Sequence, residues 1–130
     1  MKRDMDLIRE ILFEIEKAED FDLAIEISIE GRDAKEINYH LKILYQAGLI
    51  EAIGTSGFGE SSEWIATSMT WAGHEFLDSA REEKRWRQAK DMVLKRGGGL
   101  VFEVLRKVLI DLATGSVTPL IKHAIQQYSS

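Results

Sequence analysis

The chain has 130 residues, of which 45% are hydrophobic and 30% are charged, with one proline and no cysteine. This length suits one ordinary domain, and the hydrophobic fraction is sufficient to build a core. The absence of cysteine excludes a disulfide scaffold, thiol catalysis and thiolate zinc sites. The composition also excludes a disordered or collagen-like chain, so we expect a globular protein.

The formal net charge of -5 is unevenly distributed along the chain. Residues 1–30 carry four basic and ten acidic groups, whereas residues 70–96 carry seven basic and five acidic groups. Non-specific coating of nucleic acid depends on many Lys and Arg side chains, so a negative net charge disfavours it. We expect any anionic partner to approach the middle and the second half of the chain.

No segment has the pattern of a secretion signal or a membrane span. Charged residues interrupt the first twelve positions, where a signal peptide needs an unbroken apolar run. The most apolar window, residues 100–113, contains four charged residues and is too short to cross a bilayer. We therefore expect a cytoplasmic protein with no membrane partner.

The first half of the sequence predicts a helix, a strand and a second helix. Apolar residues at helical spacing predict an amphipathic helix over 4–17. Alternating aliphatic and polar residues over 23–30 favour a half-buried strand, although a shortened first helix of the helix-turn-helix over 21–30 remains an alternative. A capping-box-like Asp33 and Glu36 predict a helix over 34–47, in which Gly48 permits a left-handed cap.

The second half predicts a hairpin followed by helices. Two short strands, 49–53 and 63–69, flank a glycine-rich loop. Thr70 can cap a helix that reaches Arg96, either continuous or broken near Glu82, with inward-facing Trp71, Phe76, Leu77 and Ala80. After three glycines at 97–99, an apolar helix begins at Leu100, and a last short helix follows at 118–128.

The order of helix, strand, helix and glycine-tipped hairpin is typical of a winged helix, which presents the helix before the hairpin to the DNA major groove. We predict an α+β protein with a winged helix-turn-helix domain over residues 1–80 and a C-terminal helical extension over 81–130. Segment 23–30 leaves little room for the additional helix that winged helices have there, so the helix-turn-helix could be truncated.

Three blocks of sequence resemble a known family. The run Glu36-Ile-Asn-Tyr-His-Leu-Lys-Ile-Leu-Tyr-Gln-Ala-Gly-Leu-Ile50 is similar to the recognition helix and first wing strand of bacterial winged-helix regulators. The part of this run from Tyr39 to Ile50, together with residues 1–12 and 69–78, resembles a family of bacterial and prophage proteins, domain of unknown function number 2513, over about residues 1–96. The resemblance implies a winged-helix-like fold and a phage or prophage setting, and it implies no reaction.

We interpret two polar surfaces as candidate DNA contacts of a non-enzymatic transcriptional regulator. The outward face of the 34–47 helix can read bases or bind phosphates through Lys35, Asn38, Tyr39, Lys42 and Gln46. A later basic stretch can bind phosphates through Lys84, Arg85 and Arg87. Both sets also fit ordinary solvated helix faces, since Glu82 and Glu83 can pair with the second set.

The main alternative is a protein-interaction adaptor that uses a winged-helix frame without binding DNA. The acidic net charge and the apolar C-terminal segment favour it. We predict no enzyme, no catalytic residues, no cofactor and no metal site. The three histidines, His40, His74 and His123, lie on separate predicted elements without paired ligand spacing, and we expect His40 and His74 to be packing residues.

The C-terminal helix predicts a homodimer, because its apolar surface exceeds what one small domain would cover and two-fold dimers are the commonest assemblies. The predicted interface consists of Leu100, Val101, Phe102, Val104, Leu105, Val108, Leu109, Ile110 and Leu112. The alternative is that this helix folds back onto its own chain as an additional layer.

Overall fold

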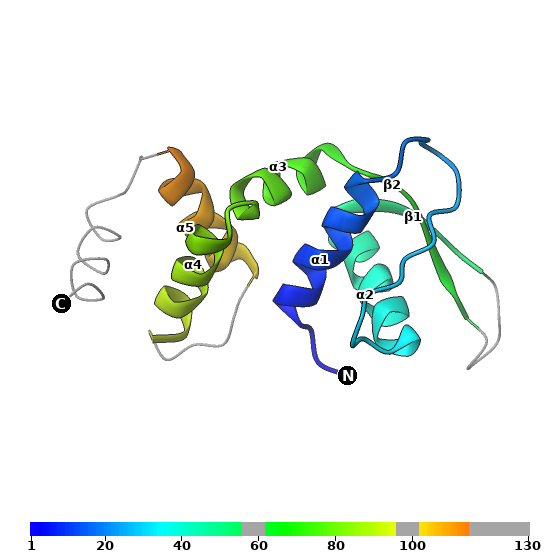
Figure 1. Ribbon diagram of the computed structural model, residues 1–130, viewed down its shortest axis with the longest axis horizontal. Helices are drawn as coiled ribbons and strands as arrows, with labels where there is room; N and C mark the ends of the chain where they lie inside the picture. The colour runs from blue at the N-terminus through cyan, green and yellow to red at the C-terminus, as the bar shows by residue number, and fades with distance from the viewer. Residues whose placement is uncertain (56–61, 96–101, 115–130) are drawn as a thin grey trace. The chain divides into compact units, whose positions relative to one another are not determined.

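The computed structural model describes residues 1–55, 62–95 and 102–114, which form five helices and a two-stranded sheet (Figure 1). The protein is therefore of mixed α+β class. It divides into two compact units, Met1–Leu77 and Asp78–Ser130, whereas the sequence placed the boundary at residue 80. None of the described helices is long and apolar enough to cross a lipid bilayer.

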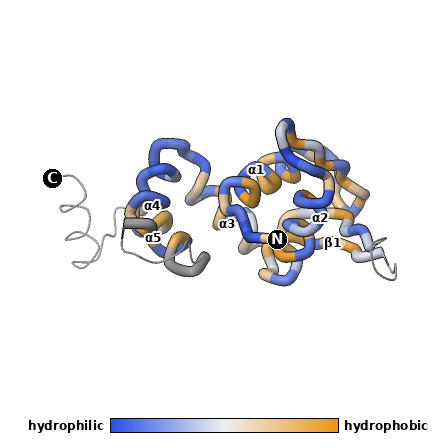
Figure 2. The backbone as a smooth tube through the Cα atoms, turned by 90° about the horizontal axis from the view of Figure 1, so that it is seen from below, coloured by the Kyte–Doolittle hydropathy of each residue, from blue (hydrophilic) through white to orange (hydrophobic). Residues whose placement is uncertain are grey.

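Helix α1 spans Met5–Glu16 and begins at a side-chain cap. The Asp4 carboxylate oxygen Oδ1 accepts the backbone N–H groups of Asp6 at 3.0 Å and Leu7 at 3.2 Å, two of the donors that a helix start leaves unpaired. One stripe of the helix is buried and consists of Leu7, Ile8, Ile11, Leu12 and Ile15. Figure 2 shows that hydrophobic and hydrophilic stretches alternate along the tube of α1. The predicted amphipathic helix is confirmed.

Segment 23–30 is not a strand, so that prediction was wrong except at one residue. Only Ile25 pairs with the sheet, through an isolated antiparallel bridge to Ala66 in which the Ile25 N–H donates to the Ala66 carbonyl at 2.9 Å. The next pair of such a ladder would join Ile27 to Trp64. The Trp64 N–H instead donates to the Asn38 side chain at 2.7 Å, so this N–H is not available to the Ile27 carbonyl.

Helix α2 spans Ala34–Gln46, close to the predicted 34–47, and ends in a Schellman motif. Gly48 has a φ of +77°, and its N–H donates to the Tyr45 carbonyl while the Leu49 N–H donates to the Leu44 carbonyl, both at 3.0 Å. The predicted left-handed cap at Gly48 is confirmed. The inward stripe of the helix is buried, as expected: Ile37, Leu41 and Leu44.

Strands β1, Ile50–Gly54, and β2, Trp64–Met69, form the predicted antiparallel hairpin. The register joins Ile50 to Met69 at one end and Gly54 to Trp64 at the other, with an irregularity after Glu51. Both α1 and α2 pack against this hairpin and against each other. The core of the first unit is therefore enclosed by two helices and one short sheet.

Helix α3 spans Trp71–Ala80 and is tied to the start of β1. The Thr70 hydroxyl accepts the Gly73 N–H at 3.1 Å, as expected of a cap, and donates to the Gly48 carbonyl at 2.6 Å. Phe76, Leu77 and Ala80 are buried as predicted, but Trp71 is 81% exposed. Trp71 was assigned to the inner face wrongly; its indole N–H donates to Glu75 one turn later, along the helix surface.

The second unit contains α4, Glu83–Lys95, and α5, Phe102–Thr114, which pack against each other. The break between α3 and α4 falls at Arg81–Glu82, which confirms the interrupted alternative. Trp86 is the largest buried side chain of this unit and is 2% exposed. The last predicted helix, 118–128, lies outside the described residues.

Replacing Gly73 by alanine should destabilise the first unit, because α3 approaches the backbone of Leu49, just before β1, too closely for a side chain. A Cβ atom there would overlap with the Leu49 carbonyl oxygen and lie 2.6 Å from Met69 Cγ. Since a backbone atom cannot rotate away, we expect Gly73→Ala to lower the free energy of unfolding by about 2 to 3 kcal/mol, the upper range for an overpacked site. Urea denaturation followed by circular dichroism measures this.

Gly31→Ala is the matched control. Gly31 has a φ of +80° but open space around it, so the added methyl group should cost only backbone strain of about 1 kcal/mol. Equal losses in the two variants would contradict the argument from close approach.

Candidate nucleic-acid interface and its polar supports

The outward face of α2 carries the residues proposed from the sequence to contact DNA. Lys35, Lys42 and Gln46 are exposed, and Tyr39 is half-buried with its ring edge-on to that of His40, 5.6 Å between centroids. These four positions fall on one side of the helix, because their spacings of four, three and four residues follow its period. They form a continuous polar surface with two lysines, which we call the α2 face.

Asn38 is placed differently from the rest of the predicted set. Its Nδ2 donates to the Ser62 carbonyl at 3.1 Å, and its Oδ1 accepts the Trp64 N–H at 2.7 Å. The side-chain amide thus bonds the backbone on both sides of Glu63, as a neighbouring strand would. The hydrogen bonds of Asn38 thus join α2 to the hairpin, and Asn38 is not part of the α2 face.

An aromatic contact also joins α2 to the hairpin. The rings of Tyr45 and Trp64 lie 5.3 Å apart between centroids and are tilted by 35°. A Cβ on Gly54, opposite Trp64 in the sheet, would meet the indole ring at 3.1 Å. The glycine therefore gives the indole room to lie between the strand and the helix.

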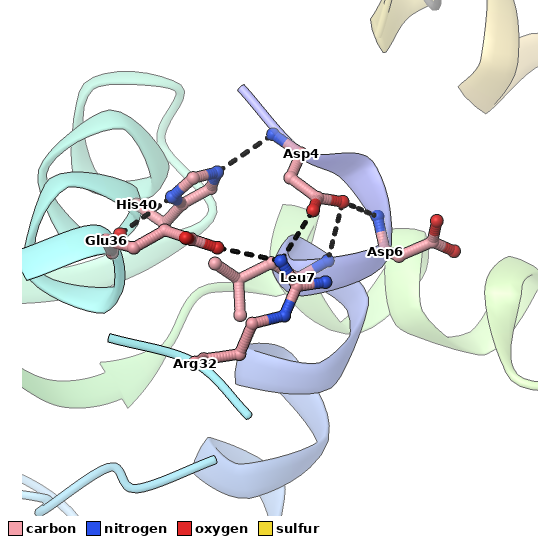
Figure 3. A network of polar contacts seen from close by, with 6 residues as sticks. All are labelled: Asp4, Asp6, Leu7, Arg32, Glu36 and His40. Carbon is pink, nitrogen blue, oxygen red and sulfur yellow. Dashed lines mark hydrogen bonds and ion pairs between the residues drawn. The ribbon is translucent and has the colours of Figure 1, made fainter. Parts of the chain in front are cut away.

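A polar network joins α2 to the start of α1 (Figure 3). Arg32 Nη1 donates to Asp4 Oδ2 and to Glu36 Oε1, both at 2.7 Å. The fully buried His40 lies with Nδ1 2.8 Å from the Glu36 carbonyl oxygen and accepts the Asp4 N–H at Nε2, at 2.9 Å. Because a carbonyl can only accept, Nδ1 carries the proton and Nε2 is free to accept. His40 is thus a packing residue, as expected, with both nitrogens bonded.

The network changes the acidity of Asp4. Burial by itself raises the pKa of this carboxyl group, but the hydrogen bond and positive charge of Arg32, with the N–H groups of Leu7 and Asp6, together lower it below 3.8. The same two carboxylates, on Asp4 and Glu36, hold the pKa of Arg32 above its usual value. The network therefore favours the ionised state of Asp4, in which its carboxylate caps α1.

A groove of about 590 Å³ lies beside the N-terminal half of α2, between segment 24–27 and the start of β2. Its floor includes the apolar Ile37 and Leu41, and its rim carries Lys35 together with Glu26 and Glu63. The two carboxylates would repel a phosphate that approached Lys35 from this side. An anionic partner is therefore expected to approach Lys35 from the α2 face.

The second predicted basic set lies on α4, in the other unit. Lys84 and Arg87 are exposed and Arg85 is half-buried. Arg85 pairs with Glu82 and Arg87 with Glu83, each at 3.0 Å, which is the balanced helix surface considered as the alternative. Ion pairs at a helix surface contribute little to stability, so these guanidinium groups can exchange a carboxylate for a phosphate at small cost.

The structure describes part of the predicted dimer interface. Helix α5 packs against α4 of the same chain, and this packing buries Leu105, Val108 and Leu109. Leu112 is half-buried. Leu100 and Val101 lie outside the described residues, and for Phe102, Val104 and Ile110 only the backbone is described. These three buried residues therefore contact their own chain. This agrees with the alternative in which the helix folds back onto its own chain instead of forming a dimer.

Among the described residues, no group of three or more His, Asp and Glu side chains lies close enough to hold a metal ion. His74 was expected to be a packing residue but is exposed. Gly73 lies on the buried side of α3, and the next residue, His74, is turned by about 100° around the helix toward solvent. His123 lies outside the described residues.

These features define a mixed α+β protein in which a helix with an exposed polar face directly precedes a β-hairpin and is bonded to it. Residues 2–99 match the family described as "Hypothetical protein (DUF2513)", and the chain belongs to that family, as its sequence blocks indicated. A protein of Haemophilus influenzae named "Uncharacterized protein" is 38% identical over 109 residues, which cover 83% of this chain and 92% of that protein. No solved structure matches the chain.

Removing the guanidinium group should raise the pKa of Asp4 and weaken the fold. In Arg32→Met, burial is no longer offset by a cation, so we expect a higher Asp4 pKa by carboxyl NMR titration and a free energy of unfolding about 1 kcal/mol lower at pH 7. Because the pKa is lowered in the folded state, its stabilising effect is present above 3.8 and is lost as the pH falls through the folded value. The difference between the proteins should therefore shrink in acid.

Arg81→Met is the matched control, since it removes an arginine from an exposed pair with Asp78 at 3.0 Å. That change should alter the stability by only a few tenths of a kcal/mol, roughly the value of an exposed helix pair. An Asp4 pKa that is the same in the wild type and in Arg32→Met would refute the assigned role of Arg32.

Proposed function

We propose that this protein is a non-enzymatic DNA-binding module of the winged-helix type, a phage or prophage transcriptional regulator. The observation that carries the proposal is the α2 face: an exposed surface with Lys35, Tyr39, Lys42 and Gln46 on the helix that directly precedes the hairpin. Winged helices insert the helix in this position into the major groove and place the hairpin along the phosphate backbone.

The bonds between α2 and the hairpin support this geometry. The two hydrogen bonds of Asn38 and the Tyr45–Trp64 contact fix the hairpin relative to the helix. Base readout requires such a fixed arrangement. Contacts to the DNA phosphate backbone set the register of a recognition helix on the bases, and the hairpin can supply such contacts only if its position relative to the helix is fixed. In this proposal the Ile25–Ala66 bridge corresponds to the third strand of a winged helix, and α2 corresponds to its recognition helix.

The charges predict weak, salt-sensitive binding. The first unit carries seven Lys and Arg residues against sixteen Asp and Glu residues, and only two of the lysines lie on the α2 face. The second unit carries ten basic and six acidic residues, among them Lys84, Arg85 and Arg87. In this proposal α2 supplies base contacts and α4 supplies much of the phosphate attraction.

The second candidate function is a protein-interaction adaptor. The excess of carboxylates on the first unit favours it, because acidic surfaces repel phosphates and attract basic proteins. In that case the α2 face is an ordinary solvated helix surface. Reversing the charge of the α2 lysines distinguishes the two functions. It should weaken DNA binding if the protein is a DNA-binding module, whereas an adaptor binds no DNA with either charge.

Selection of the full chain against a random pool of duplex DNA, followed by anisotropy measurements with the enriched sequence, tests the first function. We expect Lys35→Glu and Lys42→Glu each to weaken binding about tenfold or more, because each replaces a phosphate or base contact by a repulsive carboxylate. Replacing either lysine by alanine should lower the salt slope of the affinity by about one.

Lys17→Glu is the matched control, because Lys17 is an exposed lysine at the C-cap of α1 that pairs with Glu14 and is not part of the α2 face. It should leave the affinity within about threefold, the effect expected of net charge alone. The absence of an enriched sequence, together with no binding at low salt, would exclude DNA binding and favour the adaptor.

The regulator is further proposed to act as a homodimer through apolar residues of the second unit that are not buried within the chain. Leu112 on α5, which is half-buried, is the described candidate. Light scattering of the full chain should give a dimer that Leu112→Glu converts to a monomer, while Lys107→Glu, on an exposed position of the same helix, should not. A monomeric wild type would contradict the dimer.

A further inference from the structure

A small pocket lies at the C-terminal end of α1, away from the α2 face. Its volume is about 200 Å³, and its apolar lining consists of Ile15, Ala18, Phe21, Ile25 and Met69. Thr67, Ser68 and His74 complete the wall on the side of β2 and α3. Pockets for drug-sized ligands are usually larger than about 300 Å³, so this one suits a single inserted side chain.

The rim of the pocket is acidic. Glu16, Glu19 and Asp20 line it, and the exposed Asp22 follows two residues later. The nearby Lys17 pairs with Glu14 at 2.9 Å, which directs its charge along α1. Within the described ranges, Glu19, Asp20 and Asp22 take part in no ion pair, so the loop after α1 presents a negative potential.

Phe21 and Leu23 expose apolar surface at the same loop. Phe21, a lining residue, is 78% exposed, and Leu23 is 58% exposed. An aromatic ring at the edge of an apolar pocket, surrounded by charges of one sign, has the composition of a protein-binding centre with a polar rim. We define this surface, formed by residues 15–25 with Thr67, Ser68, Met69 and His74, as the α1-end pocket.

We propose that the α1-end pocket binds a protein partner through an aliphatic side chain flanked by lysine or arginine. The aliphatic group enters the cavity over Ile15 and Met69, Phe21 covers it, and the flanking cations pair with Glu19 and Asp20. Charge complementarity selects a basic segment over an acidic one. The same charges exclude nucleic acid from this surface, because a phosphate there would face the carboxylates.

The pocket and the α2 face share no residue, since no position of α2 lines the cavity. A partner at the α1-end pocket can therefore be tested without reference to DNA. A regulator with both surfaces would connect a DNA site to another protein, whereas an adaptor would use the pocket alone.

A random peptide library displayed on phage, selected on the full-length protein, is the probe. The Phe21→Ala/Asp20→Lys double variant serves for counter-selection. We expect enrichment of peptides with an aliphatic residue between basic residues. A synthetic copy of the enriched peptide should bind the wild type with a salt-dependent affinity, and Phe21→Ala and Asp20→Lys should each weaken it about tenfold.

Glu51→Lys is the matched control, because Glu51 is an exposed carboxylate of β1 outside the pocket. It should leave the peptide affinity within about twofold, and circular dichroism should show that all variants remain folded, as expected for exposed positions. Absence of enrichment, an acidic or purely apolar consensus, or equal binding by Asp20→Lys would overturn the proposal. A change in oligomeric state in Phe21→Ala would assign the surface to a second copy instead, and would also overturn it.

Discussion

Helix α2 satisfies backbone groups of both neighbouring elements with its own side chains, and the arrangement of the first unit depends on this. On one side, His40 accepts the Asp4 N–H at the start of α1; on the other, Asn38 bonds the backbone around Glu63 before β2. These backbone groups are partly buried, and a hydrogen bond of this kind contributes about 0.5 to 1.5 kcal/mol, so each bond disfavours displacement of the element that it holds. Apolar burial packs the elements together, and these bonds fix their register.

The same bonds explain why the sheet has two strands and one isolated bridge. Asn38 takes the Trp64 N–H that a longer pairing of segment 23–30 would need, so the ladder stops after Ile25. The Asn38 side chain thereby takes the hydrogen bond that a neighbouring strand would otherwise make. Segment 24–27 instead borders the groove beside α2. The α2 face remains open to solvent next to a hairpin that is hydrogen-bonded to α2, which is the geometric basis of the proposed DNA contact.

Charge separates the two proposed surfaces. The α2 face contains two lysines and no carboxylate, whereas the loop after α1 combines three acidic residues with the exposed Phe21 and Leu23. An anionic partner is therefore attracted to the α2 face, and a cationic partner is attracted to the loop after α1. The acidic excess of the first unit also means that any DNA affinity must come from fixed geometry at α2 and from the basic α4.

The sequence by itself determined the elements whose signals are local: the amphipathic stripe of α1, the Gly48 cap, the hairpin and the break at Arg81–Glu82. Spacing, capping and glycine conformation act within a few residues, so they can be read along the chain. Only the tertiary structure decided the partners of Arg32 and Asn38, which lie 28 and 26 residues away in Asp4 and Trp64. It likewise exposed Trp71 and reduced the 23–30 strand to one bridge, because burial and pairing depend on which surfaces the rest of the chain already occupies.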